Sequence, residues 1–403
     1  MRVAVLGGGL QGCCTAVELA IRGARVTLYD RNAALLAGAA TANEGKIHLG
    51  YVYASDRSFA TARMMLRGAL AFAPLMQRYL EADVSLAASD RFLYAVHRDS
   101  QVGVADFAAY LGATHDLVAS APDNARYFGI DLTAAPRRLT RAELGRQFDP
   151  AVVSAAFDTA EIAIDPVAMA GSMRQRITQD PAIDVRTDRT ITAVKDGDAG
   201  LQVHSVGRDH NDADACIYDS VVNALWDGRL AIDATRGLHP GRRWIYRFKH
   251  GVRFRLVGAA ELPSVTVVLG PFGDLVSYGG DSFYVSWYPA CMTARSSDLT
   301  PPVWPSKPDD PCGSPVLTES LAGMATIIPG LQHARPSDIT VKGGVIVAWG
   351  STDIDDRGSE LHRRHEIGVQ SHGRYHSIET GKLTMAPCFA MECADRVLSM
   401  RLA

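Results

Sequence analysis

The stretch Arg2–Asp30, RVAVLGGGLQGCCTAVELAIRGARVTLYD, decides the fold of this 403-residue chain. An apolar run at Val3–Leu6 leads into a glycine cluster. A helical pattern over Leu10–Arg22 follows, and a second apolar run closes on Asp30. Strand, helix and strand within one short segment predict a βαβ unit with a parallel sheet.

The glycine cluster GGGLQG has the GxGxxG spacing of a dinucleotide-binding turn. The first glycine permits a tight turn, the second lets the backbone approach a pyrophosphate, and the third lets the helix pack near the strand. The positive end of the helix then faces the phosphates. The acid that closes the second strand can accept hydrogen bonds from ribose hydroxyls, and its charge disfavours NADP. The expected contacts are Gly7, Gly9, Leu10, Gln11, Gly12, Asp30 and Arg31.

Composition excludes several other classes of protein. Apolar residues make up 47% of the chain and charged residues 21%, with a formal net charge of -3. No basic stripe indicates a nucleic-acid partner, and no apolar run reaches the length of about 18 residues that a membrane span needs. Seven cysteines without CxxC spacing favour a reduced, cytoplasmic protein. No ligand spacing for a metal is present.

The middle of the chain has a different pattern. The runs that alternate in the manner of antiparallel strands are Arg243–Val257, Ser264–Leu269, Leu275–Tyr278 and Ser282–Tyr288. A proline-rich stretch over Thr300–Pro315 is either an ordinary crossing loop or a flap over a site. The length of the chain suits two interleaved domains.

Four stretches together resemble the D-amino-acid-oxidase-like family of FAD-dependent oxidoreductases. They are VAVLGGGLQG through Asp30, TANEGKIHLGY at Thr41–Tyr51, YDSVVNALWDGR at Tyr218–Arg229, and TGKLTMAP at Thr380–Pro387. The first and last are specific in combination. The third departs from the family pattern, because Leu225 and Trp226 replace small residues.

The resemblance implies an α/β fold with a Rossmann-type FAD-binding domain and an inserted antiparallel-sheet substrate domain. The expected limits are 1–53, 150–235 and 336–403 for the FAD-binding domain, and 54–149 and 236–335 for the substrate domain. FAD is favoured over NAD by the N-terminal fingerprint and by the turn near the C-terminus. The resemblance adds these FAD contacts: Asn43, Glu44, Gly45, Lys46, Val194, Ala224, Gly381, Lys382, Leu383 and Thr384.

His48 is the leading candidate for chemistry, since the resemblance places its loop at the isoalloxazine ring. Three interpretations remain open: a catalytic base or substrate ligand, a covalent attachment point for the flavin, or a structural histidine. Lys46 lies two residues earlier and would point the same way on an extended strand. It would stabilise the reduced flavin near N1, help oxygen react near N5, or be a solvated lysine.

The antiparallel sheet supplies candidate substrate contacts. In the family this sheet covers one side of the substrate pocket, where an arginine can bind a carboxylate through two parallel hydrogen bonds. Arg247 is the candidate for that role, and Tyr284 and Trp287 would form an aromatic wall. Lys249 and Tyr288 of the same sheet are further possible substrate contacts. The alternative is that these are ordinary strand aromatics and solvent-facing arginines.

The leading functional hypothesis is oxidation of a small amine or amino acid by hydride transfer to flavin N5, with oxygen or another carrier as electron acceptor. The alternatives are oxidation of a 2-hydroxy acid or other alcohol, and a non-catalytic nucleotide-binding protein. The substrate would be a small molecule. The sequence leaves its identity, the covalent state of the flavin and the oligomeric state open.

Overall fold

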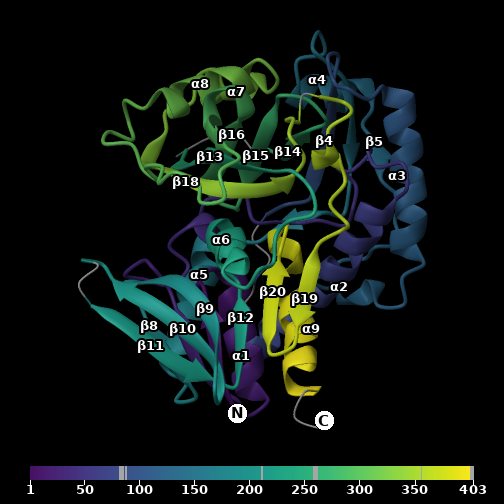
Figure 1. Ribbon diagram of the computed structural model, residues 1–403. Helices are drawn as coiled ribbons and strands as arrows, with labels where there is room; N and C mark the ends of the chain where they lie inside the picture. The colour runs from purple at the N-terminus through teal and green to yellow at the C-terminus, as the bar shows by residue number, and fades with distance from the viewer. Residues whose placement is uncertain (81–85, 87–88, 210–211, 257–261, 355, 400–403) are drawn as a thin grey trace.

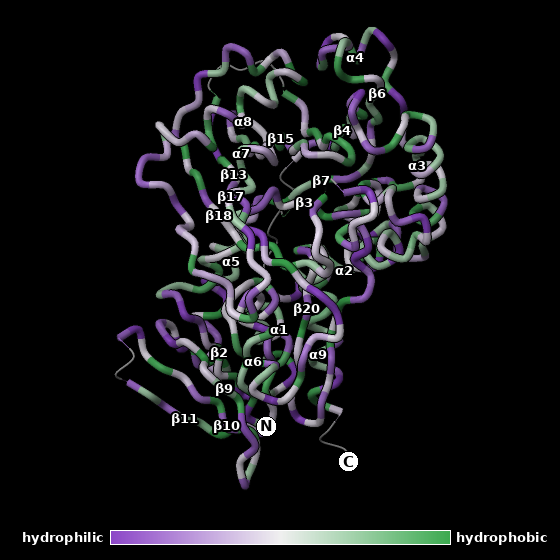
Figure 2. Tube along the Cα trace, turned by 45° about the horizontal axis from the view of Figure 1, so that its top comes forward, coloured by the Kyte–Doolittle hydropathy of each residue, from purple (hydrophilic) through white to green (hydrophobic). Residues whose placement is uncertain are grey.

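The computed structural model describes residues 1–399 except 81–85, 87–88, 210–211, 257–261 and 355. The chain forms two main sheets, one above the other in Figure 1, with the N-terminus and the end of the last described helix at the bottom of the view. Figure 2 shows the same division after the molecule is tilted. No helix in the described part of the chain is long and apolar enough to cross a membrane.

The lower sheet has six strands in the order β19-β20-β12-β1-β2-β8. All neighbours pair in parallel except β19 and β20, which form a hairpin. The predicted βαβ unit is therefore confirmed, with β1 at its centre and Val3 to Leu6 fully buried. The strands are β1 (Arg2–Leu6), β2 (Arg25–Tyr29), β8 (Ile183–Arg186), β12 (Ser220–Asn223), β19 (Gly368–His372) and β20 (Tyr375–Glu379).

Helices and a small sheet cover the six-stranded sheet. Helix α1 packs on α9, and α9 also contacts α2. The helices of this half are α1 (Leu10–Ile21), α2 (Ala60–Leu80), α5 (Pro166–Thr178), α6 (Arg229–Ala234) and α9 (Ala386–Ser399). An antiparallel three-stranded sheet lies alongside and comprises β9 (Arg189–Gly197), β10 (Gly200–Gly207) and β11 (Ala213–Tyr218).

The upper sheet has nine strands in the order β17-β13-β16-β15-β14-β4-β6-β5, with β18 also paired to β13. The strands are β4 (Phe92–His97), β5 (Arg137–Arg138), β6 (Val153–Asp158), β13 (Trp244–Arg255), β14 (Ser264–Val267), β15 (Gly273–Ser277), β16 (Ser282–Trp287), β17 (Met292–Ser296) and β18 (Ser337–Trp349). Its helices are α3 (Val104–Ala119), α4 (Arg141–Gln147), α7 (Tyr288–Cys291) and α8 (Pro315–Ala325). The predicted antiparallel block in the middle of the chain is present; residue 257 lies outside the described part.

Two strands correct the expected domain limits. Strands β6 and β18 fall inside 150–235 and 336–403, which we assigned to the FAD-binding domain. In the structure β6 pairs with β4, and β18 pairs with β13 along almost its whole length. An apolar run predicts a strand but does not indicate which sheet it joins, because that depends on partners far away in sequence.

Short elements complete the chain. Strand β3 (Lys46–Ile47) pairs with β7 (Ile162–Ala163) in a separate two-stranded sheet. The 3-10 helices are Ala39–Thr41, Asn124–Arg126, Trp226–Gly228, Pro329–Leu331, Glu360–His362 and Leu383–Met385.

Candidate active site

A large cavity, about 1310 Å³ in volume, is lined by residues from both main sheets and from the loops between them. Its wall includes the glycine-rich turn, the 37–48 loop, strand β13, Arg364 and the 380–383 turn. This volume exceeds the range of about 300–1,000 Å³ typical of drug-sized ligands. The cavity is therefore large enough for a dinucleotide and a small substrate together.

The N-terminus of α1 forms one end of this cavity. Gly9 caps the helix without a side-chain hydrogen bond, and the first turn contains no acidic residue. A Cβ atom at Gly9 would meet no protein atom within 4 Å, whereas one at Gly12 would lie 1.8 Å from the Gly7 carbonyl oxygen. The helix thus packs tightly at Gly12 and leaves open space at Gly9. An uncapped helix N-terminus beside open space is suited to an anion such as a diphosphate.

Asp30 lies beside that helix end. Its Oδ2 accepts a hydrogen bond from the Gly8 amide at 2.7 Å, and its Oδ1 accepts one from the Asn32 amide at 2.7 Å. The carboxylate is buried and lines the cavity. It is therefore held rigidly where a ribose hydroxyl could donate to its remaining lone pairs.

Most predicted site residues line this one cavity, although they come from distant parts of the sequence. Those in its wall are Gly7, Gly9, Leu10, Gln11, Asp30, Arg31, Asn43, Glu44, Lys46, His48, Ala224, Arg247, Tyr284, Gly381, Lys382 and Leu383. Three others support the wall from behind. Gly12 and Gly45 pack against backbone carbonyls, and the Thr384 hydroxyl accepts a hydrogen bond from the His48 amide at 3.1 Å.

Two predicted contacts lie elsewhere. The Val194 amide donates to Thr235 Oγ1 at 3.1 Å, and its side chain is fully buried in the core beside the three-stranded sheet. Trp287 packs against Gly323 of α8 and against Phe272. Because β16 ends at Trp287 and a helix begins at Tyr288, the alternation of strand faces breaks there, and Tyr288 lines the cavity instead.

His48 is buried and faces a fully buried carboxylate. Its Nδ1 lies 3.3 Å from Glu161 Oε1, and its ring contacts Tyr53 edge-on. Glu161 also accepts hydrogen bonds from the Leu49 amide at 2.7 Å and from the Tyr94 hydroxyl. Burial, with Lys382 and Lys46 adding to it, lowers the pKa of His48, although Glu161 opposes this shift. Burial thus favours the neutral form of the imidazole, and Glu161 lies close enough to orient the ring although Nδ1 has no hydrogen-bond partner among the described residues.

Lys46 is engaged by the protein rather than solvated. Its ammonium donates to Thr266 Oγ1 and lies 3.2 Å from Asp274 Oδ1. The same ammonium lies 4.2 Å from the centre of the Phe92 ring. Burial opposes ionisation of Asp274, but Lys46 and Lys249 lower the pKa of its carboxyl to about 2. This pair connects the 41–51 loop to the nine-stranded sheet.

Arg247 is fully buried in the cavity wall. Its Nη1 donates to Asp353 Oδ1 at 2.6 Å, while Nε and Nη2 have no partner among the described residues. Two unpaired guanidinium donors in a buried position are costly unless a ligand accepts their hydrogen bonds. The geometry therefore suits binding of a carboxylate.

Lys249 and Tyr288, which the sequence indicated as further possible substrate contacts, line the cavity beside Arg247 and Tyr284. Arg364 also lines it and was not predicted. Arg364 lies in a loop after a 3-10 helix, and no sequence pattern indicates that it turns inward.

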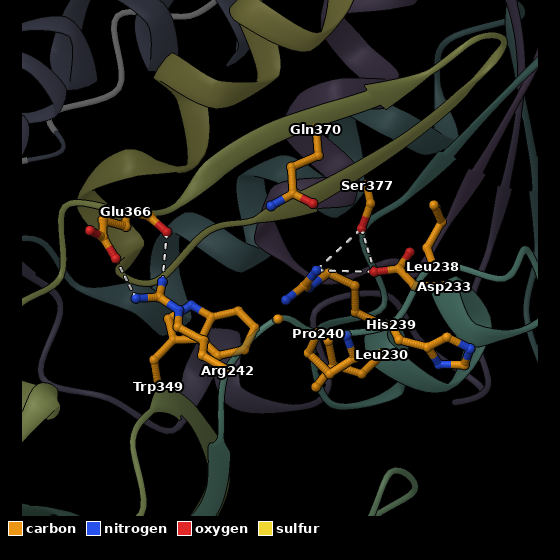
Figure 3. A pocket seen from close by; sticks show the side chains of 12 residues that line it. Leu230, Asp233, Leu238, His239, Pro240, Arg242, Trp349, Glu366, Gln370 and Ser377 are labelled. Atoms are coloured by element: carbon orange, nitrogen blue, oxygen red, sulfur yellow. Dashed lines mark hydrogen bonds and ion pairs between the residues drawn. The ribbon is translucent and has the colours of Figure 1, made fainter.

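A second, smaller cavity of about 340 Å³ lies beside α6 and β20 (Figure 3). Arg229 in its wall donates to Asp233 at 3.1 Å and to Ser377 at 3.3 Å, and Arg242 pairs with Glu366 at 2.5 Å. These charges satisfy one another, so this cavity offers no unpaired charge to a ligand.

Comparison with known proteins shows which family this chain belongs to. The chain matches the family model described as "FAD dependent oxidoreductase" (DAO) over residues 2–396, so it belongs to that family of flavin enzymes. The curated "FAD-dependent monooxygenase FPY4" of Fusarium mangiferae is 22% identical over 300 residues, which cover 74% of this chain and 64% of that protein.

Two solved structures share the fold. Glycine oxidase from Geobacillus kaustophilus has a TM-score of 0.70 at 15% identity, covering 99% of this chain and 95% of that one. Iminodiacetate oxidase (IdaA) from Chelativorans sp. BNC1 has a TM-score of 0.68 at 17% identity, with the same coverages. The expected family, α/β fold and FAD cofactor are thus confirmed, and the chain is an FAD-dependent oxidoreductase. The non-catalytic alternative is wrong.

Proposed function

We propose that this enzyme oxidises a small amine or amino acid that carries a carboxylate. The observation that supports this most directly is Arg247, whose Nε and Nη2 are buried in the cavity wall without a partner. A carboxylate at this position would accept both hydrogen bonds and fix the substrate in one orientation. The names of the structurally similar glycine and iminodiacetate oxidases agree with this substrate class.

Bound FAD supplies a hydride acceptor at N5, and the chain supplies orientation and proton management. Arg247 binds the carboxylate, and the aromatic ring of Tyr284, seated over Gly251, closes one side of the cavity. Loss of the amine proton, followed by departure of the α-hydrogen as hydride, converts the amine to an imine. Neutral His48 can accept a proton at the nitrogen that does not face Glu161.

The second candidate is oxidation of a 2-hydroxy acid. The observation that favours it is the His48–Glu161 contact, because an alcohol needs a base for its hydroxyl proton and Glu161 would stabilise the imidazolium that forms. Either reaction uses the same carboxylate position at Arg247.

Anaerobic bleaching of the flavin absorbance separates the two candidates. We expect amino acids to bleach the wild-type holoenzyme and 2-hydroxy acids to leave it unchanged. Arg247→Lys keeps the charge but loses the forked geometry, so it should raise KM more than it lowers kcat. Bleaching by 2-hydroxy acids alone, abolished in His48→Asn, would contradict amine oxidation and support the second candidate.

Two further tests on the same holoenzyme ask whether the flavin is covalently attached and which molecule reoxidises it. We propose that FAD is held without a covalent bond, so it should separate from the chain on denaturation. We also propose that oxygen reoxidises the flavin, so hydrogen peroxide should accumulate in air. Flavin retained by denatured wild-type protein but released by His48→Asn would show attachment at His48 instead.

A further inference from the structure

The substrate end of the cavity carries more positive charge than the protein neutralises. Two of its cations are paired: Lys46 with Asp274 at 3.2 Å and Arg247 with Asp353 at 2.6 Å. The cations in this part of the wall are Lys46, Arg247, Lys249, Arg364 and Lys382.

The other three cations have no acidic partner within 4 Å in the described part of the chain. Lys249 is buried, and Arg364 and Lys382 are partly buried. The carboxylate that lines the wall near them and is not already paired is Glu44. Glu44 acts on Lys249 and Lys382, and the already paired Asp274 and Glu379 also act on these three cations. Positive charge still remains in excess in a desolvated place, which is costly unless a ligand compensates it.

Oxidised FAD does not supply the negative charges that would balance these cations. Its diphosphate belongs at the N-terminus of α1, and the oxidised isoalloxazine ring is uncharged. Burial and neighbouring cations lower the pKa values of Lys382 and Arg364, as an excess of cations requires, whereas at Lys249 burial is outweighed by Tyr284, Tyr288, Glu44 and Asp274, which raise its pKa. Burial, with Arg364 adding to it, lowers the pKa of Lys382 to about 8. Burial opposes ionisation of Glu44, but Lys249, Lys382 and Lys46 lower the pKa of its carboxyl.

The surplus cations define two positions rather than one. Arg247 and Lys249 lie two residues apart on β13, so their side chains leave the same face of the strand, with Cα atoms roughly 7 Å apart. Arg247 and Arg364 repel each other, which places their charges near one another. The Lys249 ammonium lies 4.5 Å from the centre of the Tyr288 ring, and Glu44 and Asp274 act on it. Lys382 is repelled by both Arg364 and Lys249, so it lies between the two positions.

We propose that the substrate carries two carboxylates, one bound at Arg247 and Arg364 and the other at Lys249 and Lys382, as in an acidic amino acid or another short dicarboxylate amine. This rests on the proposed amine oxidation and names its substrate class. The ammonium or amine of such a substrate would lie between the two anions, on the side of Glu44.

The test uses the oxidised holoenzyme and two acids matched in carbon number, succinate and butyrate. Each is titrated at pH 7 while the perturbation of the flavin absorbance reports binding. We expect succinate to bind at least tenfold more tightly than butyrate. Lys249→Met should reduce succinate affinity to that of butyrate and leave butyrate affinity unchanged, and Lys382→Met should act in the same direction.

Lys195→Met on β9 is the matched control, because Lys195 is exposed and lies outside the cavity wall. It should bind both acids as wild type does. FAD occupancy and thermal unfolding of each variant distinguish lost binding from lost folding. Equal affinities for succinate and butyrate in the wild type would overturn the proposal, and so would equal losses of both in Lys249→Met.

Inorganic phosphate tests whether two separated groups are required. A single dianion should bind more weakly than succinate, and phosphate that binds as tightly would overturn the two-position arrangement. Failure of the proposed function gives a different result. In that case succinate would still be preferred, but no amino acid, acidic or neutral, would bleach the flavin.

Discussion

The Gly9→Ala substitution tests whether the open space at the N-terminus of α1 receives the cofactor diphosphate. The added Cβ meets no protein atom within 4 Å, and the residue has φ -73° and ψ -177°, which any L-residue adopts. Replacing glycine where alanine fits stabilises a fold by about 0.4–1 kcal/mol, because the unfolded chain loses freedom. The apoprotein should therefore unfold at the same temperature as wild type or slightly higher.

Cofactor binding should change in the opposite direction. A methyl group at Gly9 occupies the space through which the backbone approaches the pyrophosphate. A loss of about 1.4 kcal/mol already corresponds to tenfold in Kd, so we expect at least a tenfold weaker affinity for FAD. Quenching of flavin fluorescence during titration of the apoprotein measures this value.

Gly12→Ala provides the contrasting variant. Its Cβ would lie 1.8 Å from the Gly7 carbonyl oxygen, so the backbone must move. Overpacking of this kind costs about 1–3 kcal/mol, and the apoprotein itself should be destabilised. If Gly9→Ala bound FAD as tightly as wild type, the placement of the diphosphate at this helix end would be refuted.

Three further predictions concern the buried charges. Glu161→Gln removes the carboxylate that faces His48, so the pKa of His48 should fall further, as NMR titration of the imidazole would show, and unfolding free energy should drop by about 1.5–3 kcal/mol. Lys46→Met removes the cation that contacts buried Asp274 and should cost about 3–5 kcal/mol in denaturant unfolding at pH 7. Because the folded pKa of Asp274 is about 2, the stability from this pair exists above the unfolded pKa of about 3.9 and is lost as pH falls toward 2. In Lys46→Met this loss should be smaller, with Lys249 still acting on Asp274. Succinate affinity should weaken as pH rises through about 8, where Lys382 loses its proton, and Lys382→Met should not show that transition.

The first thirty residues were sufficient to predict the βαβ unit that forms one end of the cavity. Strand, turn and helix there depend on neighbours within a few residues, so local pattern indicates structure. The hairpin of β19 and β20 was not predicted. Strand β20 buries polar side chains, among them Tyr375 and Ser377, whose hydroxyls donate to Asp233 at 2.7 and 2.8 Å. A buried strand of this composition has no hydrophobic signature.

The substrate end of the cavity was predicted only in part, because contacts between residues distant in sequence determine it. Arg247 and Tyr284 were identified because alternation predicts strands there and the family resemblance places that sheet at the substrate pocket. Arg364 reaches the cavity from a loop, and Lys46 was described as free to act on the flavin although Asp274 binds its ammonium. Contacts across more than two hundred residues decide these positions, and periodicity carries no information about them.

The side chain of Gln11 has a consequence for how the enzyme is assembled. Its amide donates to the Ala386 carbonyl at 3.1 Å, and it accepts from the Thr380 hydroxyl at 3.0 Å, across 375 and 369 residues of sequence. This end of the cavity is thus completed by a contact between the helix that is synthesised first and a turn that is synthesised much later. Contacts so distant in sequence form slowly and leave apolar surface exposed meanwhile. A chain truncated before Thr380 should therefore lack a complete cavity, however much FAD is supplied.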